Sequence, residues 1–165
     1  MNRLILVADN IRSTHNVGAF FRTCDAFGAS LVLTGITPRP SGQPDDDRLP
    51  HIRQKMDDAI HKTALGAEST VTWEYFPSTD EAITHLRKSG YQVHAIEQAK
   101  SSKSISALSA DQPTALIVGP EVDGISSDVL AQVDAIYEIP MQGEKESLNV
   151  SVAAGIALYA GRFQS

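Results

Sequence analysis

The stretch that decides the fold is Ile139-Pro140-Met141, a polar loop, and then Ser147-Leu148-Asn149-Val150-Ser151. The apolar run 135–139 reads as a buried strand that stops at a proline, and helical apolar spacing follows over 148–159. The loop 142–146 is therefore expected to lie exposed between two buried elements. Ser147 stands where a helix N-cap belongs, and Asn149 falls in the first turn, where an amide has no propensity advantage. Taken alone, the segment could hold only a cap and a solvated amide.

Working outward, the same alternation of strand and helix runs through the chain. Continuous apolar runs predict strands, and apolar residues spaced three and four apart predict helices. The expected strands are 4–8, 30–36, 70–76, 91–96, 114–118 and 135–139, and the expected helices are 16–27, 51–64, 79–88 and 148–159. Residues 100–108 are polar and read as a loop. This order predicts an α/β fold, a mainly parallel open sheet with helices on both faces.

Two further segments follow predicted strands and carry polar residues without an obvious structural purpose. Asn16-Val17-Gly18 with Arg22 follows the first strand, and Gly119-Pro120-Glu121 with Gly124 follows the strand 114–118. In open parallel sheets, ligands bind at the carboxyl ends of strands, so both segments are candidates for a site. Read singly, Asn16 could be an N-cap, Arg22 a solvated helical arginine and Glu121 an exposed side chain on a tight turn.

Together the three segments, in this order and spacing, resemble the motifs of the SpoU or TrmH class of SPOUT methyltransferases. The resemblance spans almost the whole chain. It implies a C-terminal trefoil knot, a homodimer as the functional unit, and methyl transfer from S-adenosylmethionine to the 2'-hydroxyl of a tRNA or rRNA nucleotide. The expected catalytic residues are Arg22, Asn16, Glu121, Ser147 and Asn149. The resemblance implies cofactor contacts at Gly119, Ile139 and Leu148, and Ile96, Glu97 and Gln98 are further candidates.

A literal general-base role for Arg22 is unattractive, because a guanidinium stays protonated well above neutral pH. We expect Arg22 to fix a phosphate and stabilise developing negative charge, which leaves the final proton acceptor open. His15 is a rival base, although a loop histidine beside a helix start is more often incidental. No set of histidines has metal-ligand spacing, and the run 45–47 of three aspartates reads as a solvated loop, so no metal is expected.

The amino-acid composition limits the kinds of partner that we expect the protein to bind. With 42% hydrophobic and 21% charged residues over 165 positions, the chain has the composition of one soluble domain, 1–165, without a separate RNA-recognition domain. The net charge of −6 argues against a surface covered in nucleic-acid-binding patches. RNA contact is therefore expected from a local basic set, Arg12, Arg53, Lys55 and Lys62, which could equally be an ordinary solvated face. DNA is not expected as a partner.

The beginning of the chain lacks the apolar length of a signal peptide, and no run reaches membrane-spanning length. Cys24 is the single cysteine and cannot form an internal disulfide, which fits a reducing compartment. We expect a cytoplasmic protein without a membrane partner. Apolar neighbours make Cys24 a core thiol rather than a nucleophile.

Two other functions stay open at this point. A non-catalytic RNA-binding or cofactor-sensing protein could keep the fold, although retention of Arg22, Glu121, Ser147 and Asn149 argues against it. A generic doubly wound nucleotide-binding enzyme is disfavoured, because residues 119–124 lack the G-x-G spacing that lets a backbone approach a pyrophosphate.

Overall fold

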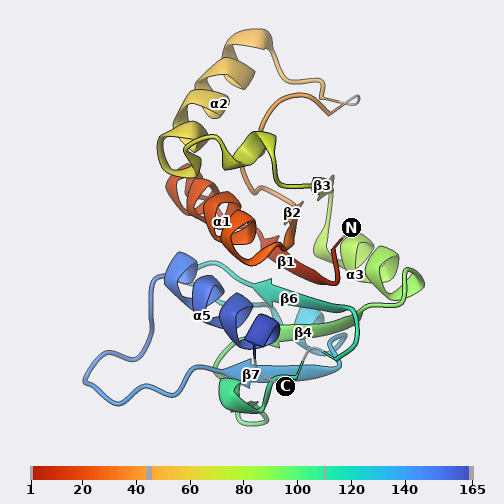
Figure 1. Ribbon diagram of the computed structural model, residues 1–165, viewed down its shortest axis with the longest axis vertical. Coiled ribbons are helices and arrows are strands. Elements are labelled where there is room, and N and C mark those ends of the chain that lie inside the picture. The colour runs from red at the N-terminus through yellow and green to blue at the C-terminus, as the bar shows by residue number, and fades with distance from the viewer. Residues whose placement is uncertain (1, 44–45, 110, 164–165) are drawn as a thin grey trace.

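The computed structural model describes residues 2–43, 46–109 and 111–163, whose strands form one parallel sheet (Figure 1). The strand order is β3-β2-β1-β6-β4-β7-β5, and every pair of neighbours is parallel. The strands are β1 (Leu4–Asp9), β2 (Ser30–Thr34), β3 (Trp73–Phe76), β4 (Gln92–Ile96), β5 (Lys103–Ser104), β6 (Thr114–Val118) and β7 (Ala135–Glu138). The two central strands, β1 and β6, are buried along their whole length, as continuous apolar runs predict.

Helices cover both faces of the sheet. They are α1 (Thr14–Phe27), α2 (Pro50–Ala64), α3 (Thr79–Lys88), α4 (Ser127–Leu130) and α5 (Val150–Phe163), with short 3-10 turns at Ala67–Ser69 and Ile105–Ala107. Alternate residues of β1 enter two separate cores: Leu4 and Leu6 pack with α1 and α5, whereas Ile5 and Val7 pack with α3 and α4. The predicted α/β fold is confirmed. The trefoil knot stays a prediction.

Helix α1 is held against α2 by a close approach at Gly18. A Cβ there would lie 2.0 Å from Thr63 Oγ1 and 2.4 Å from the carbonyl oxygen of Ile60, so only glycine fits. Thr63 Oγ1 donates to the carbonyl oxygen of His15 across the same contact, at 2.9 Å. In Figure 1, α2 accordingly lies on α1, away from α5. The first turn of α1, which precedes Gly18, is thereby fixed in position.

Five features of the structure differ from the sequence expectations. Residues 100–108 are not simply a loop, because Lys103 and Ser104 pair with β7. Helix α4 was not anticipated, and neither was the side-chain cap of α1 by Ser13, which makes Asn16 a third-position residue rather than the N-cap. Helix α5 begins at Val150, two residues later than expected. Asp46 is not solvated: its side chain is 1% exposed and bound by Arg48.

Within the aspartate run, Asp46 is bound by Arg48, whereas Asp47 is exposed as expected. The Arg48 guanidinium donates to both Asp46 carboxylate oxygens, at 2.7 and 2.6 Å, and this hydrogen bonding lowers the pKa of Asp46 to about 2. Asp45 lies outside the described residues. Cys24 is fully buried, which confirms its place in the core. Within the described ranges, no helix is long and apolar enough to cross a membrane.

Candidate active site

Three side chains from distant parts of the sequence meet where β1 and β6 end and α5 begins. The Glu121 Oε1 atom accepts hydrogen bonds from Nδ2 of Asn149 at 2.7 Å and from Nδ2 of Asn16 at 3.2 Å. Asn149 Nδ2 also lies 3.4 Å from Asn16 Oδ1. One carboxylate is thus held by two amides, each from a different segment that the sequence singled out. The cluster joins the loop after β6 to the first turns of α1 and α5.

Asn149 has a second role, as the cap of α5. Its Oδ1 atom accepts from the backbone N–H of Ser151 at 2.9 Å and from the Ser151 hydroxyl at 2.6 Å. These bonds fix the orientation of the amide, so that Nδ2 faces Glu121. The expectation that Ser147 caps this helix is therefore wrong, because Asn149 occupies the cap position. Ser147 is exposed in the preceding loop.

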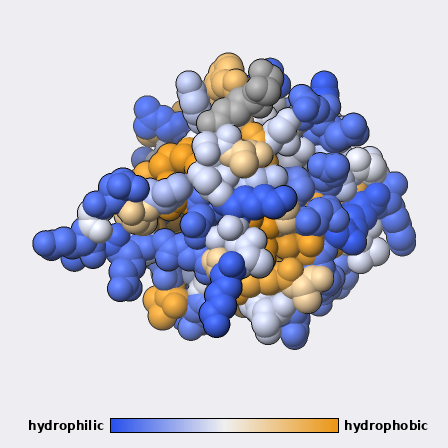
Figure 2. All heavy atoms as spheres, turned by 90° about the horizontal axis from the view of Figure 1, so that it is seen from below, coloured by the Kyte–Doolittle hydropathy of each residue, from blue (hydrophilic) through white to orange (hydrophobic). Residues whose placement is uncertain are grey.

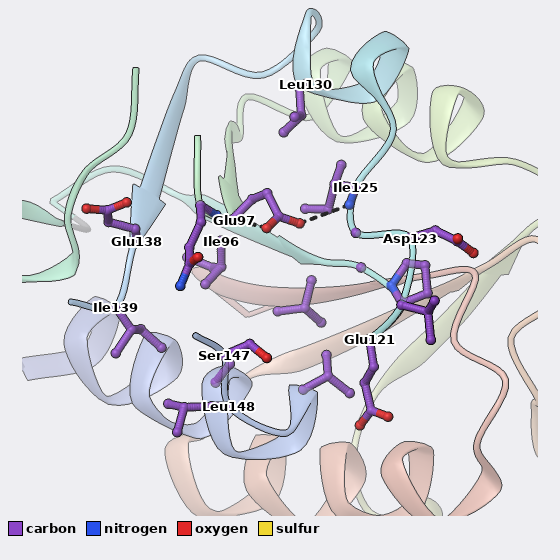
Figure 3. Close-up of a pocket in the computed structure, with 18 of the residues that line it drawn as sticks. Ile96, Glu97, Glu121, Asp123, Ile125, Leu130, Glu138, Ile139, Ser147 and Leu148 are labelled. Atoms are coloured by element: carbon purple, nitrogen blue, oxygen red, sulfur yellow. Dashed lines mark hydrogen bonds between the residues drawn. The ribbon is translucent and has the colours of Figure 1, made fainter. Parts of the chain in front are cut away.

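A cavity of about 420 Å³ opens beside this cluster (Figure 3). Three chain segments supply most of its lining: the end of β4, the loop after β6, and the segment that runs from β7 to α5. The six residues predicted to contact the cofactor all line it, namely Ile96, Glu97, Gln98, Gly119, Ile139 and Leu148. Glu121 and Ser147 also line it. The carboxyl ends of three neighbouring strands thus converge on one hollow, as open parallel sheets predict.

The cavity combines apolar walls with carboxylates. Ile125, Leu130, Ile139 and Leu148 supply apolar surface, and Figure 3 shows them around the hollow. Glu97 is a bracing residue here, because its Oε2 accepts from the backbone N–H of Ile125 at 3.0 Å and its Oε1 from that of Gln98 at 2.8 Å. The bond between Glu97 and Ile125 ties the end of β4 to the far end of the 119–125 loop.

Some residues that line the cavity were not predicted from the sequence. Glu138 is the last residue of β7 and lines the cavity one position before the predicted Ile139; its Oε2 accepts from the Ser102 hydroxyl at 2.6 Å. Ile125 directly follows Gly124, the glycine that closes the second motif. In both cases the signal was adjacency to a predicted residue. Leu130, on the unpredicted helix α4, gave no such signal.

A smaller cavity of about 130 Å³ adjoins the first. Its polar lining includes Arg12, Ser13 and Asn16 from the loop after β1 and the start of α1. The other wall is shared, because residues 120–123 and Val150 line both cavities. Arg12 thus lies beside the polar cluster rather than with the other basic residues predicted to bind RNA.

Arg22 and the remaining basic residues lie elsewhere. Arg22 is exposed on α1 and lines neither cavity, and none of the described residues forms a hydrogen bond or ion pair with its side chain. Arg53, Lys55 and Lys62 are on α2, with both lysines exposed. A single copy of the chain therefore does not bring Arg22 to the cavity walls. His15 is exposed and likewise lines neither cavity.

The chain also matches known proteins in sequence and in fold. Residues 3–159 match the model of the SpoU rRNA Methylase family. A tRNA (guanosine(18)-2'-O)-methyltransferase of Thermus thermophilus is 31% identical over 161 residues, which cover 98% of this chain and 75% of that protein. The crystal structure of the Aquifex aeolicus TrmH/SpoU tRNA modifying enzyme has a TM-score of 0.78 at 29% identity, covering 99% of this chain and 76% of that one. An AdoMet-bound rRNA methyltransferase from Sinorhizobium meliloti shares the fold, with a TM-score of 0.78 at 24% identity over 95% of this chain and 54% of that one.

Proposed function

Because this chain belongs to the SpoU rRNA methylase family, we propose that it transfers a methyl group from S-adenosylmethionine to the ribose 2'-hydroxyl of a tRNA or rRNA nucleotide. The observation that carries the proposal is the 420 Å³ cavity at the ends of β4, β6 and β7, with the Asn16–Glu121–Asn149 cluster at its edge. The name of the Thermus relative supports a tRNA substrate, and the family description supports an rRNA substrate. The test therefore includes both tRNA and rRNA.

The residues around the larger cavity fit the methyl donor. Its size lies within the range of small-molecule sites, and apolar side chains such as Ile139 and Leu148 can enclose an adenine ring. Carboxylates in the lining, Glu97 and Glu138 among them, favour a ligand with positive charge, and a sulfonium carries one. The donor would supply an electrophilic methyl group. The protein would orient it beside the hydroxyl, which can lower the barrier by about 7 to 11 kcal/mol in well-oriented cases.

We assign Arg22 a role in the active site of a second copy of the chain. In a homodimer, Arg22 of one subunit would face the cavity of the other, where its guanidinium can fix the phosphate of the acceptor nucleotide. Apolar groups on α5 support such an interface: Val152, Tyr159 and Phe163 are 50%, 55% and 61% exposed. Seen from below, the surface shows hydrophobic areas between hydrophilic residues (Figure 2).

RNA binding would fall to Arg12 beside the smaller cavity and to Arg53, Lys55 and Lys62 on α2. Phosphate neutralisation by such residues makes affinity fall with salt. The net charge of −6 makes this local set necessary, since most of the surface repels a polyanion. The single buried thiol is compatible with the cytoplasmic location that we propose.

The test combines binding with transfer. Calorimetric titration with S-adenosylmethionine should show one site per chain, and labelled methyl groups should pass to either total tRNA or rRNA as a ribose modification. A Leu148→Arg variant, which fills the cavity, should lose binding, whereas Arg162→Ala, at the far end of α5 from the cavity, should keep it. Binding without transfer to any RNA would favour a cofactor-sensing protein instead. Absence of binding would remove the cofactor from the proposal.

A further inference from the structure

A buried polar network lies at the carboxyl ends of β1 and β2. Asp9 is 3% exposed, and no ion pair among the residues that the structure describes neutralises its charge. Thr79, the first residue of α3, donates to Asp9 Oδ1 at 2.5 Å, and Thr34 donates to Thr79 at 2.6 Å. A buried carboxylate is costly unless hydrogen bonds satisfy it, so these bonds fix the side chain at the end of β1.

Asn10 connects this carboxylate to the turn after β2. Its φ of 51° is a left-handed conformation that residues other than glycine seldom adopt. Its Nδ2 atom donates to Asp9 Oδ1 at 2.8 Å, and its Oδ1 atom accepts from the Ile36 N–H at 3.2 Å. A Cβ at Gly35 would lie 2.2 Å from the same Oδ1, so only glycine leaves room for the amide. The turn after β1 is thereby tied to the turn after β2.

The loop that follows Asn10 leads directly to the candidate site. The Ile11 N–H donates to Thr37 Oγ1 at 3.0 Å, and residues 11–13 line the smaller cavity. The loop ends at the first turn of α1, where Asn16 donates to Glu121 at 3.2 Å. Helix α3 packs on the opposite face of the sheet from α1 and α5. A chain of hydrogen bonds and short backbone segments thus joins the start of α3 to the polar cluster.

We propose that Thr79 and Asp9 position the loop 10–13 for methyl transfer, although neither residue lines a cavity. The loop carries Arg12 and leads to Asn16, so a shift of the loop displaces both side chains. A displacement of about 1 Å caused by a remote substitution can lower a rate about 10²-fold. The larger cavity is lined by other segments, so donor affinity should not depend on the network. This inference rests on the proposed function.

The decisive variant is Thr79→Val, which keeps the shape of the side chain but cannot donate to Asp9. The kcat/KM for RNA should fall about 10- to 100-fold, while the dissociation constant for S-adenosylmethionine stays within about twofold. Thr79→Ser restores a hydroxyl and should recover most of the lost kcat/KM. Thr70→Val is the matched control, because it removes a hydroxyl that donates to another aspartate, Asp25, at an exposed site. It should behave as the wild type.

Asn10→Gly tests the same tie without changing α3. Glycine adopts the left-handed conformation readily, so this variant loses the two side-chain hydrogen bonds while the backbone conformation stays accessible. Amide hydrogen exchange measured by NMR should be about tenfold faster at Ile11 and Ile36 in both variants. The Ile125 amide, which donates to Glu97 beside the larger cavity, should exchange at the wild-type rate. A general loss of stability would instead accelerate exchange at all three amides.

Several outcomes would overturn the inference. A Thr79→Val kcat/KM within about threefold of wild type excludes the positioning role, and so does unchanged exchange at Ile11. Donor affinity that falls together with kcat/KM, or equally faster exchange at all three amides, would mean that the network only stabilises the fold. If Thr79→Val does not fold, Asn10→Gly decides by the same two measurements. A wild type that binds the donor but methylates no RNA refutes the proposed function itself, before any variant is compared.

Discussion

Replacing Asn149 with alanine should remove both roles of this side chain at once. The substitution removes the cap of α5, because Oδ1 no longer accepts from the Ser151 N–H, and it removes the 2.7 Å hydrogen bond to Glu121. Loss of an N-cap costs about 1 kcal/mol. The amide–carboxylate bond adds about 0.5 to 1 kcal/mol, at the low end for a charged partner because both residues are exposed.

The two contributions sum to a loss of about 1.5 to 2 kcal/mol in the free energy of unfolding. For a chain of this length, that loss corresponds to a fall in melting temperature of about 3 to 8 °C. Urea unfolding followed by circular dichroism measures this loss of unfolding free energy. The protein concentration is kept the same for all variants, because self-association would make the midpoint concentration-dependent. Affinity for S-adenosylmethionine should also fall, because residues 119–124 lose their tie to α5.

Asn149→Ser is the matched control. Serine keeps a cap oxygen for α5 but has no amide to donate to Glu121, so it should lose only the smaller contribution of about 0.5 to 1 kcal/mol. An alanine variant as stable as the wild type would refute the cap. A serine variant as unstable as the alanine variant would refute the separation of the two roles.

Three further perturbations test other parts of the structure. Arg22→Ala should abolish methyl transfer in a radiolabel assay while leaving calorimetric donor affinity nearly unchanged; lost affinity would mean that its role is misjudged. Gly18→Ala should lower the melting temperature by several degrees, since the new Cβ meets backbone atoms of α2, whereas Gly143→Ala, with open space around it, should not. Burial raises the pKa of the Cys24 thiol, so the folded state resists its ionisation. Because the unfolded chain loses that proton above about pH 8.5, stability should fall beyond it by up to about 1.4 kcal/mol per pH unit, and Cys24→Ala should flatten that slope in urea titrations.

The sequence was most informative where a local pattern alone decides the structure. The buried run of β6 and both ends of α3 were predicted to the residue, because apolar composition and helical spacing act locally; the structure shows Ser78 as the N-cap of α3. Strand β5 was missed because its two residues form a strand only through pairing with β7. The start of α5 was misplaced because the Asn149 amide, rather than Ser147, supplies the cap.

The site itself could not be derived from local patterns. Asn16 and Glu121 are 105 positions apart, and Asn16 and Asn149 are 133 apart, so only the resemblance to a family brought them together in advance. Glu138 was missed because it reads as one more strand residue. Arg22 was predicted to face the donor held by the other subunit of a dimer. A single copy leaves Arg22 outside both of its own cavities, and the dimer stays a prediction.

The strand order also has a consequence for how the chain acquires its site. The central strand β1 pairs with β6, so Leu4 cannot pair with Thr114 until the chain up to β6 has been made. The cluster around Glu121 also needs Asn149, which follows later still. Contacts between such distant residues close long loops, which slows folding. On a growing polypeptide, the first three strands can pair early, but the cavity has no third wall until the segment before α5 is made. Donor binding should therefore begin only after this segment is made, and a chain released before it would carry most of the sheet without a complete donor cavity.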